Sequence, residues 1–107
     1  MTEQKKTRRE KLEEMLAKSP TDAFTLYGLA LECKNTGDFP AAESHFRALL
    51  KTNPDYVPGY QMYAQSLVQD NRPDEAKTVL TQGIQAAQRT GNHHALSEME
   101  GLLSELS

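Results

Sequence analysis

The sequence predicts an all-α protein built as a solenoid of about six antiparallel helices. Residues 27–51 and 61–85 superimpose at an offset of 34 residues, so that Ala30 meets Ala64 and Ala42 meets Ala76. Apolar residues also recur at spacings of three and four, and no stretch keeps the period of two that a half-buried strand needs. A fixed period of this length is typical of stacked units, each of which buries its apolar face only against its neighbours.

The breaks between the expected helices fall at residues that end or begin helices. Gly37 and Asn71 occupy the same position of the repeat, and these two residue types best tolerate the left-handed conformation that closes a helix. Asp38 follows at once and can cap the next helix through its side-chain oxygen. Pro40 and Pro73 fall in first turns, where a missing N–H does little harm.

The repeat also extends backward, because Leu12 lies one period before Phe46 and Pro20 one period before Pro54. Arg8 stands where the later units have alanine, which suits a site where no helix packs. After Gln85 the repeat register is lost. We therefore expect a single domain over 1–107, whose array begins and ends inside the chain. Its parts are a half repeat at 4–18, repeats at 22–55 and 56–90, and a C-terminal capping helix at 92–106.

These positions resemble the tetratricopeptide repeat (TPR) family. The family positions of the first unit hold Leu26, Leu29, Ala30, Cys33, Ala42, Phe46, Leu49 and Pro54, and those of the second hold Tyr60, Tyr63, Ala64, Leu67, Ala76, Leu80, Gly83 and Gln88. The alanines would allow close helix approach. The chain departs from the family pattern at Leu26, which replaces a tryptophan, at Leu49, which replaces a small residue, and at Gln88, which replaces a proline. The resemblance implies a right-handed solenoid that acts as a protein-interaction module and not as an enzyme.

By the same resemblance, the first helices of the units line a concave groove that holds a peptide or a partner helix. The expected groove residues are Phe24, Tyr27, Leu31, Lys34 and Asn35 in the first unit, and Pro58, Gln61, Gln65, Val68 and Gln69 in the second. An apolar stripe beside an amide stripe suits an amphipathic helix or an extended peptide. Another interpretation of the apolar stripe is that Phe24, Tyr27 and Leu31 pack against the protein's own N-terminal helix or a second subunit. The alternative function is a self-associating structural unit, a homodimer that covers its end faces or its groove and has no separate ligand groove.

One class of TPR function is not expected. TPR domains that bind the C-terminal carboxylates of heat-shock chaperones use a clamp of lysine and asparagine on the first helices. This chain has Tyr27 and Leu31 at the first-unit positions and Met62 at the next asparagine position. The clamp is therefore absent.

Charge and composition narrow the partner classes. The net charge is -3, with 12 basic and 15 acidic residues, which gives no general attraction to nucleic acid or membrane. A basic cluster contains Lys5, Lys6, Arg8, Arg9 and Lys11. Glutamates interleave with it and no aromatic residue lies nearby to stack on bases, so we expect a solvated, frayed helix start. A single cysteine and the lack of a signal peptide or a long apolar run favour a cytoplasmic protein.

No group of residues predicts a cofactor, a metal or a catalytic centre. His93 and His94 are adjacent, and adjacent residues of a helix face different ways. Cys33 occupies a buried position of the repeat with no activating base nearby, so it is expected to be a small core residue.

Overall fold

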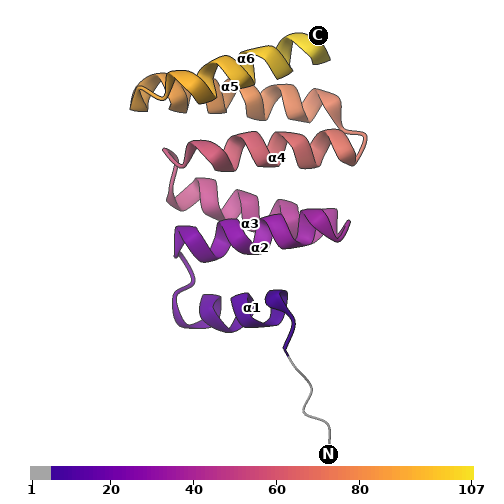
Figure 1. Cartoon of the computed structure of the whole chain (residues 1–107), viewed down its shortest axis with the longest axis vertical. Coiled ribbons are helices and arrows are strands. Elements are labelled where there is room, and N and C mark those ends of the chain that lie inside the picture. Colours follow the sequence, from indigo (N-terminus) through magenta and orange to yellow (C-terminus); the bar gives the residue numbers. More distant parts are fainter. Residues whose placement is uncertain (1–5) are drawn as a thin grey trace, which may run out of the picture.

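The structure is a computed structural model that describes residues 6–107. Within that range the chain forms six helices and no strand. They are α1 (Arg8–Lys18), α2 (Ala23–Asn35), α3 (Phe39–Thr52), α4 (Val57–Gln69), α5 (Pro73–Thr90) and α6 (His93–Leu106). The helices stack along the long axis of the molecule, with α1 at one end and α6 at the other (Figure 1). The predicted all-α solenoid of about six antiparallel helices is confirmed.

The helices end and begin where the sequence predicts. Gly37, Asn71 and Gly91 have φ angles of 80°, 58° and 71°, which is the left-handed conformation that closes a helix. The Asp38 side chain accepts a hydrogen bond from the Ala41 N–H at 3.3 Å and caps α3. Each connection is therefore a short turn with defined chemistry, and successive helices run antiparallel.

The start of α1 differs from the expectation. Residues 6 and 7 are not helical and the helix begins at Arg8, while residues 4 and 5 of the expected half repeat lie outside the described residues. Thr7 caps it, because its side chain accepts from the Glu10 N–H while the Glu10 carboxylate accepts from the Thr7 N–H. The expected frayed start is thus replaced by a capping box, whose Thr-x-x-Glu signature the sequence contains. Lys5, part of the predicted basic cluster, lies outside the described residues.

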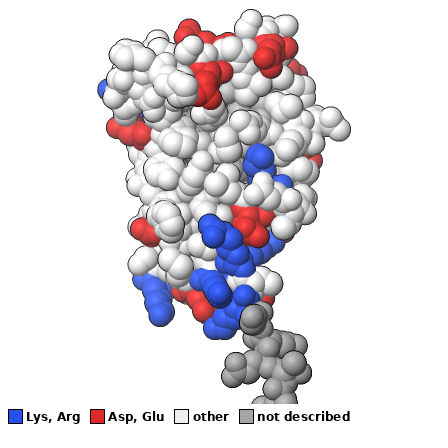
Figure 2. Space-filling model, in the orientation of Figure 1, with Lys and Arg blue, Asp and Glu red and all other residues white. Residues whose placement is uncertain are grey.

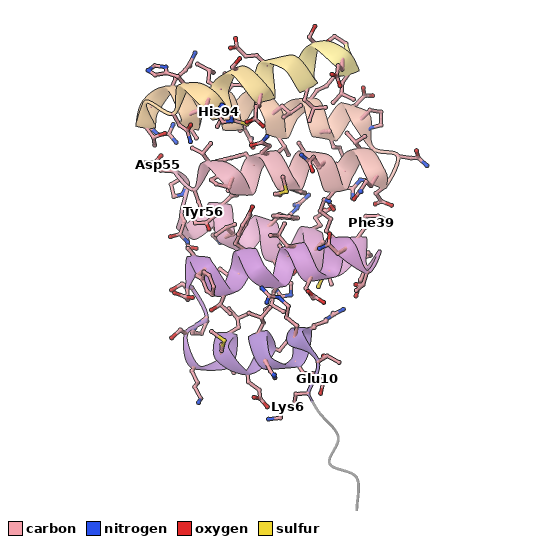
Figure 3. The ribbon with its side chains drawn as sticks, in the orientation of Figure 1. Lys6, Glu10, Phe39, Asp55, Tyr56 and His94 are labelled. Carbon is pink, nitrogen blue, oxygen red and sulfur yellow. The ribbon has the colours of Figure 1, made fainter. Side chains whose placement is uncertain are left out.

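One core cluster of buried side chains extends from α2 to α6. The four repeat alanines, Ala30, Ala42, Ala64 and Ala76, are all completely buried, as close helix approach requires. The rings of Phe46 and Tyr63 stack with centroids 5.4 Å apart and join the first unit to the second. Figure 3 shows the side chains that fill the spaces between successive helices.

The C-terminal helices pack through a glycine contact. The replacement of proline by Gln88 predicts a longer second helix, and α5 does run on to Thr90. Met99 of α6 is fully buried. An added Cβ at Gly83 would lie only 2.6 Å from both Met99 Sδ and Tyr60 Cβ. Gly83 therefore lets α4, α5 and α6 meet closely. Among the described helices, none combines the length and apolar character of a membrane span.

Candidate functional site

The first helices of the units share one face of the molecule. Helices α2, α4 and α6 contact one another in that order, whereas α3 and α5 pack behind them. The ten predicted groove residues lie on α2 and α4, and none of their side chains is buried. This is the arrangement that a binding face requires, since its side chains must reach solvent.

The α2 end of this face is apolar. Phe24 is 67% exposed, the largest exposed hydrophobic side chain of the described chain. Tyr27 is partly buried and its ring lies 5.2 Å from that of Tyr56, at the start of α4. Leu31 is partly buried against the core. Burial raises the pKa of the Tyr27 hydroxyl, with a smaller contribution from Tyr56, so Tyr27 stays neutral.

Between α4 and α6 the face is hollowed and polar. The hollow has a volume of about 310 Å³ and is lined by Gln61, Gln65, Ser97, Glu98, Gly101, Leu102 and Glu105. Gln61 donates a hydrogen bond from Nε2 to Glu98 Oε2 at 2.8 Å. His94 lies against the other oxygen of Glu98. Two of the three predicted amides, Gln61 and Gln65, therefore meet in the hollow, while the third, Gln69, lies outside its lining.

The α6 side of this hollow was not part of the predicted site. The last helix was expected only as a cap over 92–106, so Ser97, Glu98 and Glu105 were not among the predicted groove residues. The repeat offset fails after Gln85, so it could not place them. Aligning the helices by their N-caps supplies the missing signal: Asn92 follows Tyr56 by 36 residues. The same shift carries Gln61, Gln65 and Gln69 onto Ser97, Gly101 and Glu105, all of which line the hollow.

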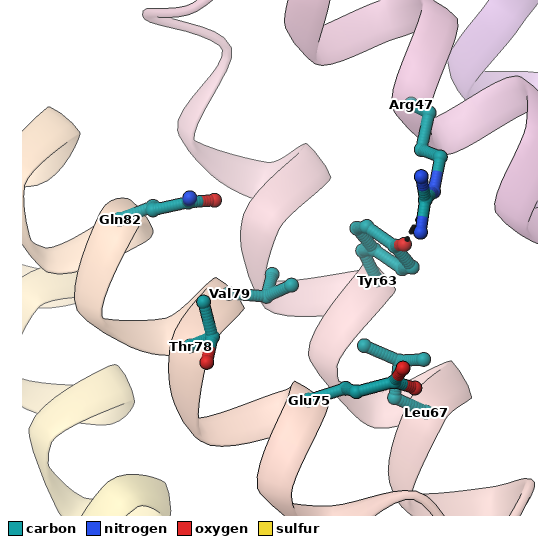
Figure 4. A pocket seen from close by; sticks show the side chains of 7 residues that line it. All are labelled: Arg47, Tyr63, Leu67, Glu75, Thr78, Val79 and Gln82. Carbon is teal, nitrogen blue, oxygen red and sulfur yellow. Dashed lines mark hydrogen bonds between the residues drawn. The ribbon is translucent and has the colours of Figure 1, made fainter.

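A second hollow of about 330 Å³ lies between α3, α4 and α5, on the other side of the stack. Its lining includes Arg47, Tyr63, Glu75 and Val79 (Figure 4). Arg47 donates from Nε to the Tyr63 hydroxyl at 3.2 Å and also pairs with Glu43 at 3.0 Å. Glu75 pairs with Arg72, and that hydrogen bond lowers the pKa of the Glu75 carboxyl. Arg47 and Glu75, the two charged residues of this lining, thus each form an ion pair within the protein.

The structure gives no chemistry to the other singled-out residues. Cys33 is completely buried, and burial raises the pKa of its thiol. Residues 6–107 contain no group of three or more His, Cys, Asp or Glu side chains placed to hold a metal ion.

The sequence model of the tetratricopeptide repeat family matches residues 36–99. The chain belongs to this family. Among curated proteins, none matches the chain significantly.

Solved structures agree with this assignment. A tetratricopeptide repeat domain protein from Salinibacter ruber, solved by solution NMR, is 31% identical, with a TM-score of 0.77 over 83% of this chain and 90% of that one. A protein of Bordetella parapertussis is 25% identical, with a TM-score of 0.82 over 95% and 89% of the two chains. The TPR2B domain of yeast Sti1, solved as a complex with pHsp70, is 18% identical, with a TM-score of 0.84 over 92% and 78%. The last likeness concerns the fold alone.

Proposed function

We propose that this TPR protein is an interaction module that binds a peptide or a partner helix across α2, α4 and α6. The observation that carries the proposal is Phe24, a large apolar side chain that is 67% exposed on this face. Exposing it to water is unfavourable, and an apolar partner side chain would remove that cost.

The proposed contacts divide between the two ends of the face. Phe24, Tyr27 and Leu31 supply apolar anchoring on α2. The polar groups that set orientation are Lys34, Asn35, Gln61, Gln65 and Gln69. An array of this size offers a small contact area, so we expect modest affinity. The proposal includes no catalysis, and the buried free thiol of Cys33 suits a reducing compartment such as the cytoplasm.

The experiment compares Phe24→Glu with a matched control, Thr78→Glu. Both residues are exposed, but Thr78 lies on α5 and lines the other hollow. Phe24 is a better probe than Tyr27, because Tyr27 packs against Tyr56 and its replacement would disturb the fold. Affinity capture with each protein, read by mass spectrometry, should recover polypeptides that are lost with Phe24→Glu and kept with Thr78→Glu. Equal recovery by all three proteins would refute groove binding.

Light scattering of the same proteins separates the alternative. In the homodimer, a second copy covers Phe24, so the wild type would be dimeric and Phe24→Glu monomeric. A monomeric wild type would refute self-association and leave the groove open for a different polypeptide.

A further inference from the structure

We infer that the polypeptide bound by this groove places a lysine or arginine side chain in the hollow between α4 and α6. The inference rests on the proposed function, and it names the partner's chemistry at one end of the groove.

The lining of the hollow has the chemistry that receives a cation. Glu98 and Glu105 contribute carboxylates, and Gln61, Gln65 and Ser97 contribute neutral hydrogen-bonding groups. No lysine or arginine lines the hollow, and no described side chain forms an ion pair with Glu105. An ammonium or guanidinium group would find charge-assisted acceptors here. Glu98 already contacts His94 and Gln61, so Glu105 is the carboxylate of this hollow without a described partner, whereas both charged groups of the second hollow are paired.

The last turn of α6 adds to this potential, because Glu105 lies there and lines the hollow. Helices α1, α2, α3 and α5 each have a basic residue in the last turn, but α4 and α6 have none. The C-terminal end of a helix carries partial negative charge, which a nearby cation stabilises. Helices α4 and α6 run in the same direction, so their C-terminal ends lie at the same edge of the groove (Figure 1). Arg72 pairs with Asp70 just past the end of α4, which leaves α6 as the helix end without a basic residue. Glu105 sits in the last turn of α6, where it strengthens the negative potential.

Gly101 keeps the hollow open. A glycine weakens the interior of a helix relative to alanine. Gly83 and Gly59 have a packing reason, because an added Cβ would lie 2.6 Å and 2.9 Å from neighbouring side chains. At Gly101 an added Cβ would meet nothing within 4 Å. The protein's own packing therefore does not require this glycine. Its missing side chain leaves room in the hollow for the long side chain of a lysine or arginine from the partner.

The charge distribution on one face of the molecule points the same way. In the face shown in Figure 2, lysine and arginine side chains gather around the α1 end, and acidic side chains dominate at the α6 end. Helix α6 contains Glu98, Glu100 and Glu105 and no lysine or arginine. A partner whose cation lies toward α6 and whose apolar anchor lies toward Phe24 would match both ends of the groove.

The distance between the two ends of the groove also sets the number of residues that separate the partner's apolar anchor from its basic residue. Neighbouring packed helices lie about 8–10 Å apart, so the path from α2 across α4 to α6 is about 20 Å. An extended chain rises about 3.3 Å per residue and would cover this path in about six residues. A helix rises about 1.5 Å per residue and would need about thirteen. The spacing between the apolar anchor and the basic residue thus reports how the partner binds.

The experiment selects ligands from a random-peptide display library on the wild-type protein and on the double variant Glu98→Gln, Glu105→Gln. Peptides selected on the wild type should be enriched in lysine or arginine at one of the two spacings from an apolar residue. Their affinity, measured by fluorescence polarisation, should fall about fivefold to tenfold on the double variant, and the wild-type affinity should weaken with added salt. Gly101→Met, which fills the hollow, should also weaken binding while keeping the helical circular dichroism.

The control for position is Glu100→Gln, which removes one carboxylate charge from the same helix outside the hollow and is compared with each of the two single variants, Glu98→Gln and Glu105→Gln. It should leave affinity within about twofold of the wild type, as expected for a charge that contacts no ligand. If Glu100→Gln weakens binding as much as the double variant, a general charge effect explains the result and the site is wrong. If peptides depend on Phe24 but lack basic enrichment, or bind the double variant unchanged, this inference fails and the proposed function stands. If Phe24→Glu weakens the binding of no selected peptide, the proposed function is wrong, and the inference that rests on it is wrong as well.

Discussion

Two glycines inside helices, Gly83 and Gly101, should respond in opposite ways to replacement by alanine. In an exposed helix interior, alanine is more favourable than glycine by about 1 kcal/mol. Gly101 has nothing within 4 Å of an added Cβ, so Gly101→Ala should gain about 0.5–1 kcal/mol. At Gly83 the same gain is opposed by overpacking, because the added Cβ would lie 2.6 Å from Met99 Sδ and Tyr60 Cβ.

The size of the Gly83 effect follows from which neighbours can move. Met99 is flexible, but Tyr60 Cβ is fixed to the backbone of α4, so α4 and α5 must separate. Overpacking of this kind costs about 1–3 kcal/mol, and at its upper end the net loss is about 2 kcal/mol. For a domain of this length, that loss lowers Tm by about 10 °C, whereas Gly101→Ala should raise Tm by about 4 °C.

The assay is thermal unfolding followed by circular dichroism, with urea unfolding as a second measure of the free energy. The two variants add the same methyl group to helices of the same protein, so each serves as the control for the other. Shifts of equal sign would refute the reasoning, because they would mean that helix propensity alone decides both sites. A stabilised Gly83→Ala protein would show that α5 does not approach α4 and α6 as closely as described.

Three further outcomes follow from charged groups near α1 and α2. Arg9→Gln removes the 2.9 Å hydrogen bond from Arg9 Nη1 to Asp38 Oδ2, so amide hydrogen exchange should accelerate in α1 and change little in α4–α6. Burial, followed by the charge of Arg9, lowers the pKa of His45 below its ordinary value of 6.5. The unfolded chain therefore binds more protons there, so stability should fall as pH drops below 6.5 toward the folded pKa, and His45→Gln should flatten that slope in urea unfolding at several pH values. Hydrogen bonds from Thr25 lower the pKa of the Asp22 carboxyl below its ordinary value of 3.8. The stability that this cap contributes is therefore fully present above pH 3.8 and is lost as the pH falls through the folded pKa. In Asp22→Asn, acid unfolding should no longer show this loss of stability.

The fold was predictable because its signals are local and repeated. The four buried alanines, the left-handed Gly37 and Asn71, and the Asp38 cap each follow from a residue type at a fixed position of the repeat. Helical spacing also places Phe24, Tyr27 and Leu31 on one face of α2, and their role as the apolar end of the proposed groove stays a prediction. A repeat period does not predict side-chain hydrogen bonds between different helices, such as the one from Gln61 to Glu98. That bond joins side chains 37 positions apart in different helices.

The acidic half of the groove escaped prediction for a reason that lies in α5. One period before Gln88 stands Pro54, which closes the first unit. Without a proline, α5 continues to Thr90, four residues past the position that matches the end of α3 at Thr52. The link to α6 is two residues shorter than the link from α3 to α4, so α6 begins two residues later than the period predicts.

Because of this shift of two residues, an offset of 34 does not align Ser97, Gly101 and Glu105 with the amides of α4, although their own spacing is unchanged. Ser97, Gly101 and Glu105 recur at every fourth residue, as Gln61, Gln65 and Gln69 do, and so they present one helix face. The face of the proposed groove therefore differs in chemistry from helix to helix: apolar on α2, amide on α4, and small and acidic on α6. A ligand selected by this face must match all three in that order, which is a stronger constraint on the partner than the fold alone provides.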